Sequence, residues 1–195
     1  ECEVQQIIVE KNQTRGVLLD DGRELGASVV ASSVDANLTF NHFLKEGDLP
    51  SSFRAAVDRI DYSSATAKIN LALSELPNFT CLPSTGIAPQ HNGTIHIGET
   101  VEEVERAFDD AKYGEPSKNP IVEITIPTSV DRTIAPEGKH IMSMFVQYAP
   151  YRRKVGLVWD NIKEGFADRW VERVAEYAPN IQNAIEHRQV LSPVD

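Results

Sequence analysis

The chain has 195 residues, of which 41% are hydrophobic and 25% charged, a composition typical of a globular protein with room for a large core. A net charge of -10, from 29 acidic and 19 basic side chains, argues against nucleic acid and anionic membrane surfaces as partners. No apolar run approaches the roughly 20 residues that cross a bilayer, and no signal-peptide pattern is present, so we expect a soluble protein without a transmembrane segment.

The first 36 residues predict a small β-meander. Residues 3–10 and 16–19 are rich in Val, Ile and Leu, and Asp20, Asp21 and Gly22 form a tight turn after the second of these strands. Residues 28–34 are a short apolar run of the kind found in buried strands. This meander has too little surface for its own core, so we expect it to dock on another part of a protein.

The remaining residues predict alternating helices and strands. A long loop rich in Pro and Gly covers 76–92, and Thr100 with Glu103 forms a capping-box pair at the start of a helix that ends at Gly114. A further helix extends from about 159 to 177, where apolar residues recur at intervals of three and four. The other expected elements are a helix over 49–60 and strands over 66–73, 94–97 and 121–126.

The central strand is expected in the stretch IMSMFVQYAPY, residues 141–151. Both sides of this strand are largely apolar, which predicts a strand covered on both faces. Pro150 cannot continue a hydrogen-bonded ladder, so the strand should end near Tyr148. Gln147, Tyr148 and Tyr151 would then lie at its rim, where pockets form, and are the candidate substrate-pocket residues.

These elements predict an α+β fold, in which a β-meander is followed by a mostly antiparallel sheet of four or five strands flanked by helices. We expect two parts, the meander over 1–36 and a second domain over 37–195. The chain begins with Glu and leads almost at once into a strand, so we expect a fragment or internal segment of a longer protein.

No catalytic constellation can be read from the residues. The five histidines form no metal-ligand pair, Cys2 and Cys81 have no CxxC spacing, and no metal site is expected. His96 and Lys68 lie on the polar sides of strands, where a structural or solvated role is the more frequent one. The basic run 152–154 is interpreted as a solvated turn. No Gly-x-Gly is present, so neither a dinucleotide fingerprint nor a P-loop is predicted.

Several stretches together resemble one protein family. Residues 3–37, EVQQIIVEKNQTRGVLLDDGRELGASVVASSVDAN, are similar to a segment of phytoene-dehydrogenase-related flavoproteins that is shared by many amine-oxidase-like enzymes. Two later runs, PTSVDRTIAPEGKH and FVQYAPY, resemble more specifically the branch of pyridine nucleotide-disulphide oxidoreductase domain-containing protein two. The resemblance covers essentially the whole chain but only the middle of such a protein.

The resemblance implies the substrate-domain part of an FAD-dependent oxidoreductase. In that family the meander belongs to the FAD domain, and the rest is a substrate-binding or cap domain whose sheet covers the flavin. The resemblance implies that Val4 would lie against the adenine of FAD. It also implies that Ala31, Ser32 and Ser33 would lie near the path back to the cofactor. The glycine-rich loop that binds the pyrophosphate is missing here, so this chain alone should not hold FAD and should be inactive.

The resemblance further implies an apolar or amine-like small-molecule substrate, with the remainder of the same polypeptide as partner. A flavin performs the redox chemistry itself, which fits a substrate domain without acids or bases of its own. The alternative is a non-catalytic binding or interaction module that has lost its cofactor site. A hydrolase or metal enzyme has no supporting motif. The compartment stays open: cytoplasmic for a bacterial protein, mitochondrial by resemblance to animal relatives.

Overall fold

A computed structural model describes residues 2–61, 66–98 and 100–195. The chain divides into two compact units, which we call the N-terminal unit (residues 1–62) and the C-terminal unit (residues 63–195). No helix within the described residues combines the length and the apolar character that a bilayer crossing needs. The assignment of residues 1–36 and 37–195 to two functional domains stays a prediction. Residues 37–61, which follow the meander, belong to the same compact unit as the meander.

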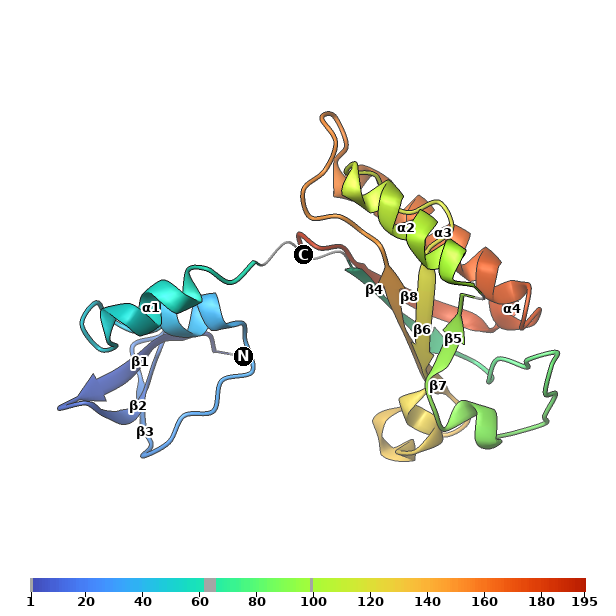
Figure 1. Ribbon diagram of the computed structural model, residues 1–195. Coiled ribbons are helices and arrows are strands. Elements are labelled where there is room, and N and C mark those ends of the chain that lie inside the picture. Colours follow the sequence, from blue (N-terminus) through green and yellow to red (C-terminus); the bar gives the residue numbers. More distant parts are fainter. Residues whose placement is uncertain (1, 62–65, 99) are drawn as a thin grey trace. The chain divides into compact units, whose positions relative to one another are not determined.

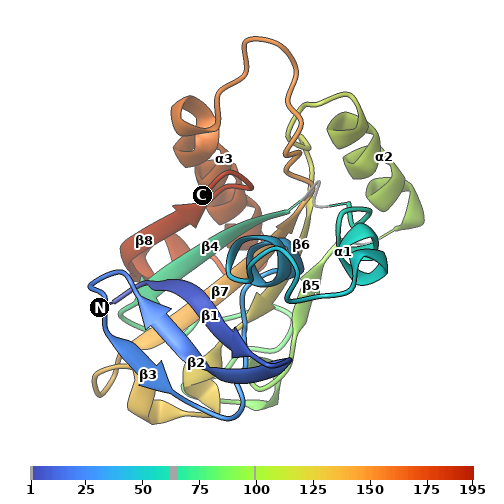
Figure 2. The same cartoon turned by 90° about the vertical axis from the view of Figure 1, so that its left-hand side faces the viewer.

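The N-terminal unit contains the predicted meander (Figure 2). Strands β1 (Val4–Glu10), β2 (Gln13–Leu19) and β3 (Glu24–Gly26) pair antiparallel in chain order. A π-helical turn at Leu38–His42 and helix α1 (Ser51–Val57) follow, and Phe40 packs edge-on against Phe53 with 5.0 Å between the ring centroids.

The core of the N-terminal unit is thin. Ile7, Leu19 and Val57 are buried, whereas Val29 is 78% exposed and Phe53 is 43% exposed. The expectation that the meander cannot build a substantial core by itself therefore agrees with its side-chain burial.

The prediction of a strand over 28–34 was wrong. These residues form no regular structure, and most of them are exposed. A strand needs a neighbour for its backbone groups, and β3 ends at Gly26 with no turn that would bring the next residues back to its edge. The apolar run instead borders cavities described below.

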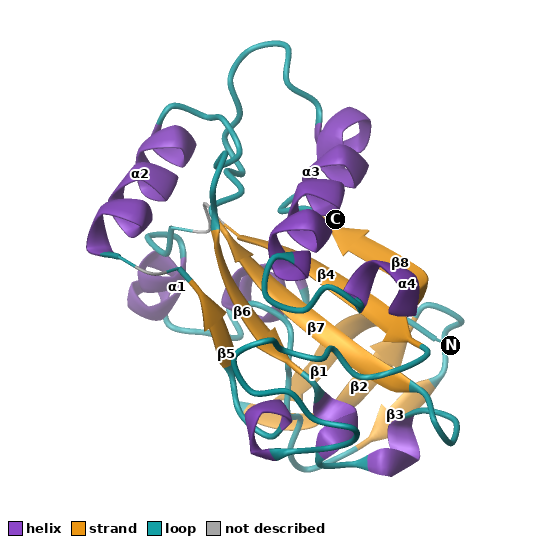
Figure 3. Ribbon diagram, turned by 90° about the vertical axis from the view of Figure 1, so that its right-hand side faces the viewer, coloured by secondary structure: helices purple, strands orange, loops and turns teal. Residues whose placement is uncertain are grey.

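The C-terminal unit is a five-stranded sheet with helices on one side (Figures 1 and 3). The strand order is β5-β6-β7-β4-β8 and every neighbouring pair is antiparallel, which confirms the α+β class. The strands are β4 (Thr66–Leu73), β5 (Ile95–Ile97), β6 (Ile121–Thr125), β7 (His140–Gln147) and β8 (Ile185–Leu191), and the helices are α2 (Val101–Lys112), α3 (Trp159–Ala175) and α4 (Ile181–Ala184).

Alternation along the strands builds one core between the sheet and α3. Met142 and Met144 of β7 are fully buried, as are Ile69 of β4 and Ile124 of β6. Helix α3 adds three aromatic rings in contact, in which Phe166 lies edge-on to both Trp159 and Trp170, with 5.5 and 5.9 Å between the ring centroids. Helix α2 begins with the predicted capping box, because the Thr100 side chain accepts from the Glu103 N–H at 3.2 Å.

Strand β7 is the central strand, as predicted, but the prediction that both its faces are covered was wrong. Phe145 is 42% exposed, whereas Met144 and Val146 on the other face are inaccessible. Lys68 and Asn70 of β4 lie opposite Phe145 and Ser143, so this face is polar around the aromatic ring, and no helix of the described C-terminal unit packs on it (Figure 1). We call this surface the open face.

Candidate functional site

The N-terminal unit contains a cavity of about 410 Å³ beside the start of β1. Val4, Ala31, Ser32 and Ser33, the four residues that the family resemblance implies at the cofactor, all line this cavity. The other lining residues are mostly apolar and come from Glu3 and β1, from β2, from segment 28–34 and from the residues after Asp35. We call this space the meander cavity.

Local hydrogen bonds hold the walls of the meander cavity. The hydroxyl groups of Ser32 and Thr39 lie 2.7 Å apart, and the Ile7 N–H donates to the Phe43 carbonyl at 2.7 Å. The Asp35 carboxylate accepts from the Leu38 N–H at 3.0 Å and so caps the π-helical turn. These bonds tie Ser32 of the irregular segment 28–34 to the π-helical turn, and they tie β1 to the residue that follows this turn.

A second cavity, of about 820 Å³, shares Ile7, Val30, Ser32 and Val34 with the meander cavity. Its remaining wall includes Phe40 and Leu44. Val30 and Val34 of segment 28–34 thus border both cavities rather than a packed core. A volume of several hundred Å³ with mostly apolar walls is typical of a site for a small molecule or a cofactor.

On the open face of the C-terminal unit, His96 and Lys68 lie in one row that crosses four strands. His96 lies opposite Glu123, Glu123 opposite Phe145, and Phe145 opposite Lys68. In the next row the Ser143 hydroxyl donates to the Asn70 side-chain oxygen, and the Asn70 amide donates to Gln189, both at 3.0 Å. The exposed ring of Phe145 is therefore surrounded by titratable and amide side chains.

The three predicted substrate-pocket residues are not brought together. Gln147 shares the open face with Phe145, since residues two apart on a strand point the same way. Tyr148 packs edge-on against Phe108 of α2 at 5.4 Å, and its N–H donates to the Ser117 hydroxyl at 3.1 Å. Tyr151 is 48% exposed in the following loop. None of the three lines the two cavities of the N-terminal unit.

The basic run after Tyr151 is exposed, and one of its members is paired. The Lys154 ammonium donates to the Glu115 carboxylate at 2.7 Å, which raises the pKa of Lys154 and lowers that of Glu115. The Lys154 N–H also donates to the Gly114 carbonyl at 3.0 Å. This loop is therefore tied to the end of α2 by a surface contact.

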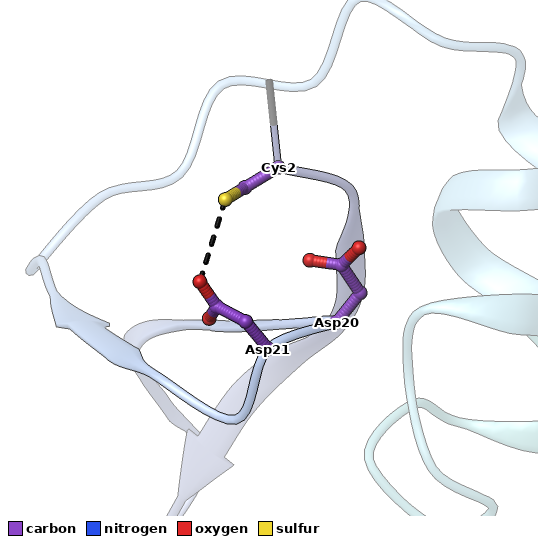
Figure 4. Close-up of side chains that lie close together, drawn as sticks. All are labelled: Cys2, Asp20 and Asp21. Carbon is purple, nitrogen blue, oxygen red and sulfur yellow. Dashed lines mark hydrogen bonds between the residues drawn. The ribbon is translucent and has the colours of Figure 1, made fainter.

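Cys2, Asp20 and Asp21 lie close enough for their ligand atoms to fall within 4.8 Å of one another (Figure 4). The Arg23 guanidinium already occupies this group, because it donates to the Asp21 carboxylate at 2.7 Å and to the Cys2 sulfur at 2.9 Å. Hydrogen bonds from the Arg23 backbone and side chain lower the pKa of Asp21. The group is an exposed ion pair at the β2–β3 turn.

Sequence reasoning missed a polar centre in the C-terminal unit formed by two irregular segments. His91 is buried, its Nδ1 accepts from the Ala88 N–H at 3.1 Å, and its Nε2 donates to the Pro77 carbonyl at 3.0 Å. These bonds give His91 a structural role as a neutral imidazole. His140 lies at the start of β7, with its Nδ1 3.4 Å from the Thr128 hydroxyl. The signal available in the sequence was one histidine in the loop rich in Pro and Gly over 76–92 and a second one directly before residues 141–151.

His140 makes the stability of the chain pH-dependent. Its pKa lies below the ordinary value of 6.5, mainly because burial disfavours the charged ring, with additional effects from His91 and Arg132. As the pH falls through 6.5 the unfolded chain binds a proton that the folded chain does not, so His140 lowers the free energy of unfolding. Urea unfolding from about pH 7.5 to about pH 5 should therefore show a shallower decline for His140→Gln than for the wild type. Equal slopes would contradict this assignment.

The comparisons with known proteins agree with the sequence motifs. The chain is 37% identical over 190 residues to pyridine nucleotide-disulfide oxidoreductase domain-containing protein 2 of Rattus norvegicus and of Mus musculus, covering 95% of this chain and 33% of each relative. It is 24% identical over 193 residues to the chloroplastic prolycopene isomerase of Daucus carota, covering 97% of this chain and 28% of that protein. The chain thus spans about a third of the length of these relatives.

No protein-family model matches the chain. Among solved structures, an oxidoreductase from Methanosarcina mazei aligns with 22% identity and a TM-score of 0.44 over 98% of this chain and 37% of the other. A protein from Pyrococcus furiosus aligns with 19% identity and a TM-score of 0.45, over 97% and 36% respectively. Over nearly its whole length, this chain is similar to one part of pyridine nucleotide-disulfide oxidoreductase domain-containing protein 2, which confirms the resemblance drawn from its motifs.

Proposed function

We propose that this chain is the central part of an FAD-dependent oxidoreductase, in which the N-terminal unit contributes to the cofactor site and the C-terminal unit supplies the substrate surface. The observation that carries the proposal is the meander cavity. Its wall contains all four residues implied at the cofactor, although one of them lies in β1 and the other three in a segment about 30 residues later.

The meander cavity fits the adenosine end of FAD better than the pyrophosphate. Its volume is about 410 Å³ and its wall includes Val4, Ile7, Val17 and Phe43, which suit a flat, largely apolar ring. Ser32 and Ser33 offer hydroxyl groups to a ribose. The chain has no glycine-rich loop for phosphates, so those groups would be bound by the rest of the polypeptide.

The open face supports the substrate role of the C-terminal unit. Phe145 is 42% exposed at the centre of the sheet and offers an apolar surface, while Lys68 and Glu123 on either side offer charge. A flavin supplies the redox chemistry, so this surface needs to bind and orient an apolar or amine-like molecule and exclude water. Gln147, at the end of the same face, would take part in that binding.

The visible absorption spectrum of the purified protein expressed from its complete gene tests the proposal. We expect bound flavin in that protein and none in the 195-residue chain alone, because the chain lacks the phosphate-binding loop. A complete protein that stays colourless after FAD is added would overturn the proposal and favour a non-catalytic binding module.

A pair of valine variants of the complete protein tests the meander cavity itself. Val4→Asp places a carboxylate in the cavity wall and should abolish flavin retention. Val29→Asp makes the same change at a residue that is 78% exposed and lines neither cavity, so flavin should be retained. Equal flavin content in the two variants would remove Val4 from the cofactor site.

A further inference from the structure

The C-terminal unit contains a cavity of about 470 Å³ where the segment after β4 meets the connection between β6 and β7. Leu76, Ile87 and Pro136 form its apolar wall, and Thr128, Arg132 and His140 provide polar groups. We call this space the loop cavity. It belongs to neither the meander cavity nor the open face, so the inference drawn from it goes beyond the proposed function.

The charges around the loop cavity are unevenly paired. The Lys139 ammonium, at its edge, forms an ion pair with Glu186 of β8. Arg132, by contrast, has no carboxylate within ion-pair distance in the part of the chain that the structure describes, although Glu137 also borders the cavity. The donors of the Arg132 guanidinium are therefore not taken up by a carboxylate of the described residues and are available at the cavity wall.

The hydrogen bonds of Thr128 fix the other polar group. The Thr128 hydroxyl is buried, accepts from the Ile141 N–H at 3.2 Å and lies 3.4 Å from Nδ1 of His140, to which it can donate its own hydrogen. An imidazole that accepts at Nδ1 carries its proton on Nε2 when neutral. His140 can then act as a second donor at the cavity wall.

We propose that the loop cavity binds a small organic monocarboxylate, with the Arg132 guanidinium and the His140 imidazole donating to the carboxylate and the apolar wall contacting its hydrocarbon part. One unpaired guanidinium matches one negative charge, whereas a phosphate dianion would need further cations. Three apolar residues beside the polar wall call for an acid with a short apolar body rather than a bare ion.

The histidine ring signals of the 195-residue chain provide the test by nuclear magnetic resonance. Hexanoate should shift the His140 signal in a saturable way, and this signal is identified by its loss in His140→Gln. Hexan-1-ol has the same apolar body without the charge and should bind at least about tenfold more weakly, because a hydrogen bond between charged groups is lost. Inorganic phosphate should also bind more weakly, since it lacks the apolar body.

Two arginine variants make the test specific to the cavity. Arg132→Gln should weaken hexanoate binding by about tenfold or more, whereas Arg106→Gln, the same change on the exposed side of α2, should leave it within about twofold. Glu137→Gln should strengthen binding, because a competing carboxylate is removed from the cavity edge. Equal effects of the two arginine variants, no saturable shift with hexanoate, or tighter binding of phosphate than of hexanoate would each overturn the proposal. None of these measurements depends on flavin.

Discussion

Replacing Phe166 with alanine is expected to lower the free energy of unfolding of the C-terminal unit by about 3–5 kcal/mol. Phe166 is 1% exposed and lies between the rings of Trp159 and Trp170, so its removal leaves a cavity that two large, rigid side chains cannot collapse to fill. Urea unfolding followed by tryptophan fluorescence measures the effect, because the only two tryptophans of the chain flank the substituted ring.

Phe145→Ala is the matched control for this prediction. The same type of side chain is lost from the same unit, but from β7 on the open face, where Phe145 is 42% exposed. We expect a loss of about 1 kcal/mol or less, since little buried contact disappears. Similar losses for the two variants would mean that the open face is a packed surface and would contradict the one-sided core.

The one-sided core shows where periodicity predicts structure well. Strict alternation in β4 and β6 placed Ile69 and Ile124 inside, and the three-four spacing in α3 placed Phe166 and Trp170 on its buried side. These elements pack against neighbours that the same chain supplies. Local pattern and tertiary contact therefore agree, and the sequence was sufficient.

The structural predictions failed where the hydrophobic pattern of a segment does not indicate which residues lie beside it in the fold. Ile141 and Phe145 are apolar, which suggested a second buried face of β7, yet Lys68 of β4 lies opposite Phe145 and Asn70 lies opposite Ser143. The register that brings Lys68 beside Phe145 joins two residues that are 77 positions apart (145 − 68), and it cannot be read from β7 alone. Segment 28–34 failed for a related reason, since an apolar run becomes a strand only beside a partner.

The candidate sites also differ in how far the sequence predicted them. The grouping of Val4 with Ala31, Ser32 and Ser33 came from the family resemblance, and the structure shows them around one cavity. The loop cavity was missed because Arg132 lies in a connection that has no periodic pattern, His140 lies where that connection enters β7, and the segment containing Leu76 and Ile87 is another such loop. Contacts between two irregular segments depend on turns and side-chain hydrogen bonds such as that of Thr128, which carry no repeating signal.

Gly16→Ala is expected to break the pairing of β2 with β3 and to destabilise the N-terminal unit by about 2–4 kcal/mol. Gly16 has a φ of +148°, and a Cβ added there would lie 1.9 Å from the Leu25 carbonyl oxygen, so the backbone of β3 would have to move. The Ala27 N–H donates to the Arg15 carbonyl at 2.8 Å beside this contact, and its hydrogen-exchange protection should be lost.

Gly26→Ala is the control for Gly16, because the two glycines are directly paired across β2 and β3. A Cβ at Gly26 meets only the Arg15 carbonyl oxygen, at 3.9 Å, so protection of the Ala27 amide should persist. Unchanged protection in Gly16→Ala would contradict the β2–β3 register.

Val17, next to Gly16, lines the meander cavity, so in the complete protein Gly16→Ala should also reduce flavin retention while Gly26→Ala should not. Loss of amide protection without loss of flavin would support the register but place the cofactor outside this cavity.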